Sequence, residues 1–252
     1  MKTIAVWNMK GGVGKTTISF NLATQLAKKG SKVLCLDFDS QANFTSFFEK
    51  DVNRKRKKAN ISEVITNDFR GFNESIYISK RFTNIGYITG SNNETTLIPK
   101  PESFSSALKG LDNKYDYCVI DCPPSYMSLS YLALYVADLV VVPILLDGFS
   151  RDNLNLVREY LSSIENDKDL ISEMKYVVLA NKVANRKCQK EVFSDLIKKH
   201  DYPFIEICIS DSAVVSSANA IHKPLYMHRS KSQVASDFDE VSNELIALLE
   251  EV

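Results

Sequence analysis

The feature that most constrains this chain is a run of glycines and lysines placed between an apolar segment and a helical one. Thr3–Trp7 is short, apolar and β-branched, as a buried strand is. Glycines then let the backbone curl so that several N–H groups face one anion, and the start of the following helix adds partial positive charge. The sequence therefore predicts a phosphate-binding loop at residues 10–17.

Each residue type in this loop suits one part of a nucleoside triphosphate. The Lys15 amine is placed to reach the β- and γ-phosphates, the Thr16 hydroxyl to bind Mg²⁺, and Thr17 to contact the α-phosphate. The common pattern G-x-x-x-x-G-K-[ST] would place a glycine where this chain has Met9, and the chain carries a second lysine, Lys10, instead. The predicted nucleotide-binding residues of the loop are Lys10, Gly11, Gly12, Val13, Gly14, Lys15, Thr16 and Thr17.

Short apolar runs alternate with helical patterns along the rest of the chain. Near-continuous apolarity is typical of strands that are covered on both faces, as in a parallel sheet. Alternating strands and helices predict an α/β fold, a doubly wound and mostly parallel sheet flanked by helices, and we expect residues 1–252 to form a single domain. The expected strands are Thr3–Trp7, Val33–Leu36, Ile85–Thr89, Tyr117–Ile120, Leu139–Ile144, Tyr176–Ala180 and Phe204–Ile209.

Acidic residues follow two of these strands. Asp37 and Asp39 end the second strand, and strand alternation sends both side chains to the same side. Asp121 ends the apolar run Tyr117–Ile120, which is the pattern of a Walker B strand. Carboxylates at the C-terminal ends of parallel strands face the ligand crevice. Asp121 is therefore the predicted Mg²⁺ residue, together with Thr16, and water is expected to complete the coordination.

The string Lys-Gly-Gly-Val-Gly-Lys-Thr-Thr at residues 10–17 resembles the ParA/MinD-type ATPases, the deviant Walker A group, and most closely the small ParA/Soj-like partition ATPases. The resemblance implies an ATP-dependent homodimer in which Lys10 crosses the interface and touches the partner's nucleotide. It also implies that Asp39 positions the attacking water, although Ser40 stands where the family's D-x-D-P-Q segment has proline. Lys10, Lys15 and Asp39 are the catalytic residues that it implies.

The resemblance extends into the C-terminal third of the chain. In related proteins an asparagine at the end of the strand here reads the adenine edge, and Asn181 holds that place. Ser210 replaces a proline in a stretch that family members use against the base, and His222 replaces the glycine of a G-K-P-V turn.

Composition narrows the class of protein without identifying a binding partner. Lysine plus arginine equals aspartate plus glutamate, 31 each, so the total charge gives no reason to expect nucleic acid. The five cysteines are widely spaced, with no C-x-x-C pair, which suits a reducing cytoplasm. The N-terminus reads as a strand and not as a signal peptide, and Leu129–Leu146 as a helix followed by a buried strand and not as a membrane span.

Three functions fit this resemblance. The first is a partition ATPase that binds DNA non-specifically as an ATP dimer, associates with the nucleoid, and hydrolyses ATP slowly when a ParB-like protein activates it. Phosphate contacts of that kind need only summed positive charge. The DNA-binding candidates are Lys187, Lys190, Lys223, Arg229 and Lys231, with the basic run 54–58 as a second candidate.

The second function is a MinD-like positioning ATPase that cycles on a membrane or another cellular surface. Such proteins end in a basic amphipathic helix. From residue 232 onward this chain has six acidic residues and no basic one, which argues against an anionic membrane. The third function, a metabolic enzyme of the same fold, lacks support, because neither cluster-binding cysteines nor a substrate-binding insertion is found.

Overall fold

The structure is a computed structural model that describes residues 1–48, 57–91, 100–126, 128–167, 175–184, 187–198 and 202–250. Its centre is a seven-stranded sheet in the order β3-β4-β2-β5-β1-β6-β7. Every neighbouring pair is parallel except β3 with β4. The strands are β1 Lys2–Val6, β2 Val33–Asp37, β3 Tyr77–Ile78, β4 Ile85–Ile88, β5 Tyr117–Asp121, β6 Leu139–Leu145 and β7 Tyr176–Asn181.

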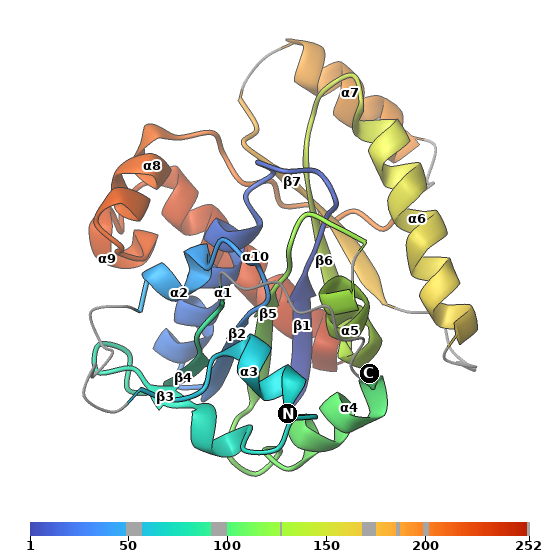
Figure 1. The fold of residues 1–252 in the computed structure, drawn as a ribbon. Coiled ribbons are helices and arrows are strands. Elements are labelled where there is room, and N and C mark those ends of the chain that lie inside the picture. The colour runs from blue at the N-terminus through green and yellow to red at the C-terminus, as the bar shows by residue number, and fades with distance from the viewer. Residues whose placement is uncertain are drawn as a thin grey trace.

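Helices cover both faces of the sheet, as a doubly wound fold requires (Figure 1). One buried cluster lies between the sheet and α1 and α10, and the other lies on the α4, α5 and α6 side. The helices are α1 Lys15–Lys28, α2 Asn43–Ser46, α3 Ile61–Thr66, α4 Pro101–Lys109, α5 Ser128–Val136, α6 Ser150–Asp167, α7 Lys187–Lys198, α8 Ala213–Ala220, α9 Leu225–His228 and α10 Gln233–Glu250, with a 3₁₀ turn at Asn73–Ser75.

Strand alternation divides the apolar residues of β1, and Trp7 directly after it, between these two clusters. Ile4 and Val6 face α1 and α10, whereas Ala5 and Trp7 face the opposite side, and all four are fully buried. With both faces covered, the strand can be apolar at nearly every position. This is the physical reason why the continuous apolar runs predicted strands correctly.

The strand order places β1 at the centre of the functional edge. β1 lies between β5 and β6, so the loop after β1 meets the C-terminal ends of strands on both sides. Ligands of open α/β sheets bind at this edge, at the point where the strand order reverses. The fold therefore brings the glycine loop, the acids after β2 and β5, and the ends of β6 and β7 together.

Two expectations about strands are corrected. Phe204–Ile209 is not a strand, because it bonds to the sheet edge at separate points: a bridge of Val178 with Phe204, a hydrogen bond from the Ile209 N–H to the Ala180 oxygen at 2.9 Å, and, just beyond the run, a bridge of Val183 with Ser210. β3 has only two residues and was not expected. Elements this short carry too little periodicity to be seen in sequence. No helix in the described part of the chain is both long and apolar enough to cross a membrane.

Candidate nucleotide-binding site

The loop after β1 has the backbone of an anion cradle. Gly12 and Gly14 adopt φ values of 75° and 97°, in the left-handed region that favours glycine. A side chain at Gly14 is also excluded by space, since a Cβ there would lie 2.4 Å from the Asn181 Nδ2 atom. α1 begins at the next residue, Lys15, so its N-terminus completes the cradle as predicted.

Lys15 lies within its own loop. Its Nζ atom donates to the carbonyl oxygens of Asn8 and Lys10, at 2.9 and 3.2 Å, and the residue is 7% exposed. Burial lowers the pKa of this amine, while the charges of Asp121, Cys122 and Asp39 act to raise it. A buried ammonium beside carboxylates is well suited to meet an incoming phosphate.

Asp121 ends β5 directly beside the helix N-terminus. Its Oδ1 atom accepts from the Ser19 hydroxyl at 2.9 Å, and the Thr16 side chain also favours the charged carboxylate. Its buried Oδ2 atom has no hydrogen-bond partner. Burial, followed by the nearby charge of Asp37, raises the pKa of Asp121 above its ordinary value. A buried acceptor without a donor fits a cation, so Thr16 and Asp121 suit Mg²⁺.

The described residues contain no group of three or more histidines, cysteines, aspartates or glutamates that could hold a metal ion. Mg²⁺ is usually held by one or two carboxylates together with phosphate oxygens and water, and Asp121 would supply one such carboxylate.

Asp37 holds the start of the following loop. Its Oδ2 atom accepts from both the backbone N–H and the hydroxyl of Thr45, each at 2.7 Å. The residue is 1% exposed, and burial raises the pKa of its carboxyl group despite these donors. Gly90 packs so closely on Asp37 that a Cβ would lie 3.0 Å from the carboxyl group. Asp37 therefore acts as a structural anchor beside the metal residues.

Asp39 lies two residues further on and remains partly exposed. Its Oδ1 atom accepts from the backbone N–H of Gln41 at 2.9 Å, and its carbonyl oxygen accepts from Ala42 N–H at 2.9 Å. Ser40, in the place of the family's proline, lies in the resulting turn. The charge of Asp39 acts on both Lys15 and Asp121. Asp39 thus lies at the edge of the site, close enough for its charge to act on the predicted phosphate and metal residues.

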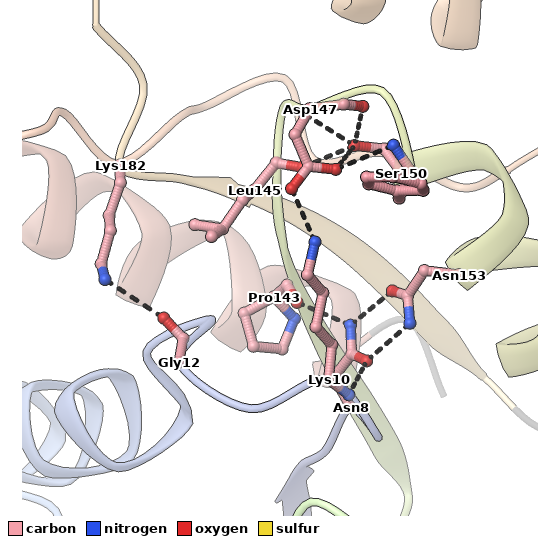
Figure 2. Close-up of polar contacts among 10 residues, drawn as sticks. Asn8, Lys10, Gly12, Pro143, Leu145, Asp147, Ser150, Asn153 and Lys182 are labelled. Carbon is pink, nitrogen blue, oxygen red and sulfur yellow. Dashed lines mark hydrogen bonds and ion pairs between the residues drawn. The ribbon is translucent and has the colours of Figure 1, made fainter.

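Lys10 points away from the loop that Lys15 occupies. Its Nζ atom lies 2.6 Å from the Asp147 Oδ2 atom, in the connection between β6 and α6 (Figure 2). The two side chains are 34% and 37% exposed. Asp147 is itself fixed, since its N–H donates to the Ser150 hydroxyl and its Oδ1 atom accepts from Phe149 N–H. Lys10 is therefore held at the protein surface by Asp147.

A buried asparagine joins the loop to this same connection. The Asn8 Nδ2 atom donates to the Pro143 carbonyl oxygen and the Asn153 Oδ1 atom, both at 2.9 Å (Figure 2). Its Oδ1 atom accepts from Lys10 N–H at 2.9 Å and from the Asn153 amide at 3.1 Å. The backbone of Lys10 is thus tied to β6 and α6, as its side chain is.

The end of β7 contacts the other side of the loop. Asn181 Nδ2 donates to the Val13 carbonyl oxygen at 2.7 Å, and Asn181 Oδ1 accepts from Lys182 N–H at 2.9 Å. Lys182 Nζ donates to the Gly12 carbonyl oxygen at 3.1 Å. The side-chain amide of Asn181, which the sequence assigns to the adenine edge, therefore makes both of these hydrogen bonds within the protein. Nearby, the Asn219 amide of α8 donates to the Thr17 hydroxyl at 2.9 Å.

The loop after Asp121 rests on the chain's one tryptophan. Trp7 is fully buried, and its Nε1 atom donates to the Ser125 carbonyl oxygen at 3.2 Å. Cys122 is also fully buried, and burial raises the pKa of its thiol well above the ordinary value. This agrees with a packing role for Cys122, because only a thiolate is an effective nucleophile.

The candidate DNA-binding residues are exposed but do not form one patch. Lys187 and Lys190 lie on α7, whereas Lys223, Arg229 and Lys231 flank α9 on the opposite side of the sheet (Figure 1). Lys187 also forms an ion pair with Glu191, with 3.8 Å between the Lys187 Nζ and Glu191 Oε1 atoms. Of the second candidate, the run 54–58, residues 54–56 lie outside the described part of the chain.

Sequence reasoning missed Asp147, Lys182 and the pair Asn8 and Asn153. Asp147 follows β6 just as Asp121 ends β5, so the rule for acids at strand ends could have found it. Lys182 carried no such signal. Its hydrogen bond to Gly12 depends on a positive φ, which the presence of a lysine in the sequence does not predict.

Comparison with known proteins finds relatives that match most of the chain. Residues 1–176 match the family model described as an AAA domain. The chain is 28% identical over 255 residues to the sporulation initiation inhibitor protein Soj of Bacillus subtilis, covering 98% of each chain. It is 30% identical over 195 residues to a virulence plasmid ParA family protein of Chlamydia psittaci, covering 68% of this chain and 67% of that protein.

A solved structure shares the fold at lower identity. The septum site-determining protein MinD from Pyrococcus horikoshii, complexed with Mg-ADP, superposes with a TM-score of 0.77 at 21% identity, covering 97% of this chain and 95% of that one. The matched family and relatives, together with a glycine loop backed by strand-end carboxylates, lead to one conclusion: the chain belongs to the ParA/MinD-type P-loop ATPases, which use ATP and Mg²⁺.

Proposed function

We propose that this chain is a ParA-like partition ATPase that forms an ATP-dependent sandwich dimer, binds DNA non-specifically and segregates plasmid or chromosomal DNA. The single observation that carries this proposal is the different placement of the two loop lysines. Lys15 is buried inside its own loop, whereas Lys10 extends outward to Asp147 with a third of its side chain exposed. A cation placed in this way reaches the nucleotide of a second subunit once it leaves Asp147.

The chemistry proposed for the site is positioning and charge neutralisation, as phosphoryl transfer generally requires. Mg²⁺, when bound by Thr16 and Asp121, would supply positive charge against the β- and γ-phosphate oxygens. Lys15 and the loop amides bind the same phosphates from within the subunit. Asp39, at the partly exposed edge of the site, orients a water molecule for in-line attack, and Lys10 from the second subunit adds charge only in the dimer.

Slow turnover by the isolated protein follows from this division of roles. Lys15, Asp39 and Asp121 lie near one another within one subunit, whereas Lys10 of that subunit is paired with Asp147. A ParB-like partner that stabilises the competent dimer would therefore raise the rate without supplying a new reacting group.

The composition of α10 supports DNA over a membrane as the surface on which the protein cycles. Its apolar residues Val234, Phe238, Val241 and Leu245 are buried in the cluster shared with α1. Its outer side carries acids, among them Asp239, which pairs with Lys29 at 3.1 Å. A helix whose apolar side is used in the core and whose polar side is acidic is unsuited to an anionic bilayer.

The alternative is a MinD-like positioning ATPase, and the chain's similarity to MinD keeps it open. One experiment separates the two functions. The protein with ATP is incubated with linear DNA of random sequence and, separately, with vesicles of anionic phospholipid, at two salt concentrations. Partition predicts ATP-dependent DNA binding that weakens steeply with salt, with no vesicle binding. Vesicle binding without DNA binding at low salt would establish the alternative.

A further inference from the structure

Two consecutive residues at the end of β7 hold two consecutive carbonyl groups of the phosphate loop. Asn181 Nδ2 donates to the Val13 oxygen at 2.7 Å. Lys182 Nζ donates to the Gly12 oxygen at 3.1 Å (Figure 2). Neither carbonyl binds phosphate, so these bonds act on the shape of the loop and not on the ligand directly.

The geometry of the peptide unit gives these contacts a consequence. A trans peptide is planar, and its C=O and N–H bonds point in opposite directions. Drawing the Gly12 oxygen toward Lys182 therefore turns the Val13 N–H away from β7, and drawing the Val13 oxygen toward Asn181 does the same for the Gly14 N–H. These N–H groups belong to the run of amides that makes such a loop an anion cradle.

We propose that Asn181 and Lys182 are positioning residues that pre-orient the peptide units Gly12–Val13 and Val13–Gly14, so that their N–H groups face the triphosphate before it binds. The proposal goes beyond the partition function and needs only that the loop binds a nucleotide. Pre-oriented donors bind phosphate more tightly, because the loop loses less freedom when the ligand arrives.

The Asn181 amide can face only one way. Its Oδ1 atom accepts from Lys182 N–H at 2.9 Å, so rotating the amide by half a turn would set two donors against each other and two acceptors against each other. Asn181 is 5% exposed, and its amide sits where a Gly14 Cβ would be. The asparagine and the glycine therefore fit one another as a pair.

Lys182 reaches the loop through an unfavourable backbone conformation. Its φ of 53° lies in the left-handed region, which is uncommon for lysine. Gln189 on α7 stabilises this conformation: its Nε2 atom donates to the Lys182 carbonyl oxygen at 3.3 Å, and its Oε1 atom accepts from Ala184 N–H at 2.7 Å. Such conformations persist where the surroundings enforce them and are frequent at functional sites.

A nucleotide without a base separates this role from base recognition. The variant Asn181→Leu removes the donor to Val13 without adding a charge beside the phosphates, and affinities for Mg-ATP, Mg-GTP and Mg-tripolyphosphate are measured by calorimetry. Positioning predicts parallel losses of at least about tenfold for all three ligands, with the ratio of ATP to GTP affinity unchanged. An unchanged tripolyphosphate affinity with a shift in selectivity toward GTP would overturn the proposal, because that is the behaviour of a base reader.

Lys182→Met removes the second contact and one positive charge, whereas Lys182→Arg keeps the charge. We expect tripolyphosphate and ATP affinities to fall together by about three- to tenfold, and Lys182→Arg to restore most of the loss. Lys114→Met is the matched control, since Lys114 also donates one side-chain hydrogen bond, to Asn73 Oδ1 at 2.9 Å, far from the loop.

Equal affinities in Lys182→Met and Lys114→Met would refute the role of Lys182. If the unaltered chain binds neither ATP nor tripolyphosphate, the assignment of the nucleotide site is wrong. That result differs from one in which the unaltered chain binds both ligands and only the positioning role of Asn181 and Lys182 fails. Thermal unfolding by circular dichroism confirms that each variant is folded.

Discussion

The Nζ atom of Lys10 lies 2.6 Å from the Oδ2 atom of Asp147 within the same subunit (Figure 2). Burial alone would raise the pKa of Asp147, but the hydrogen bonds from Lys10 and from Phe149 N–H, with the charge of Lys10, bring that pKa below its ordinary value. The carboxylate is therefore charged at neutral pH. A lysine that must reach a second subunit's nucleotide has to leave this partner first.

Replacing Asp147 by Asn should favour the ATP-bound dimer, because the amide holds Lys10 less strongly than the carboxylate does. Pairs this exposed contribute only a fraction of a kcal/mol to about 1 kcal/mol, so we expect the dimer dissociation constant to fall by about two- to tenfold. Sedimentation velocity with a non-hydrolysable ATP analogue measures it. A weaker dimer would mean that Asp147 itself serves the interface. Asp195→Asn, which breaks the exposed pair with Arg151, is the control.

The two lysines of the loop should give different defects. Lys15→Ala removes a buried cation from the phosphate site and leaves the carbonyl oxygens of Asn8 and Lys10 without their donor. We expect its ATP affinity to fall at least about a hundredfold, the scale of losing a buried charged contact. Lys10→Ala should bind ATP as a monomer and fail to dimerise. Calorimetry and size-exclusion chromatography separate the outcomes, and equal defects in both variants would contradict the division of roles.

The sequence was sufficient to place the glycine loop, the acid Asp121 at the end of β5 and most of the sheet. Gly12, Gly14 and Lys15 could be placed because the strand, the turn and the helix all lie within one short stretch of chain. The acid Asp121 followed from the parallel sheet rule, since β1 and β5 end side by side in register, Val6 beside Asp121. Local pattern and sheet geometry were enough for these residues.

The contacts that hold the loop could not be predicted in the same way. Lys10 and Asp147 are separated by 137 positions, and Asn181 and Val13 by 168. Each contact depends on how far the β6–α6 and β7–α7 connections reach over the sheet edge, which periodicity does not encode. The Phe204–Ile209 segment failed for a related reason, because an apolar run beside an edge strand can bond to it at isolated points without becoming a strand.

The buried acids should make stability depend on pH. Burial raises the pKa of Asp37 and of Asp121 above 3.8, their value in the unfolded chain. The native state therefore binds more protons than the unfolded state above that pH, so the free energy of unfolding falls as pH rises toward and past the raised values. The midpoint of thermal unfolding without nucleotide should decline from about pH 4 to about pH 8.

Asp121→Asn should flatten this decline, because an amide imitates the neutral carboxyl group. Asp112→Asn, at an exposed carboxylate that pairs with the N-terminal amine at 3.3 Å, should leave the slope in place. Mg-ATP should oppose the decline in the unaltered protein, since a cation compensates the paired carboxylates. A slope that is the same in Asp121→Asn and in the unaltered protein would show that other groups cause it.

Asp39→Ala should leave ATP binding intact and stop turnover. Asp39 lies at the edge of the site, where its Oδ1 atom accepts from Gln41 N–H and its charge acts on Lys15 and Asp121. Losing the residue that orients water while keeping every phosphate contact should trap an ATP-bound dimer, with phosphate release reduced by about a hundredfold or more. Asp39→Asn preserves the bond to Gln41 but lacks the charge, so the same loss in both variants assigns the effect to the carboxylate. Only monomer in Asp39→Ala with ATP, on size-exclusion chromatography with light scattering, would count against the sandwich dimer itself.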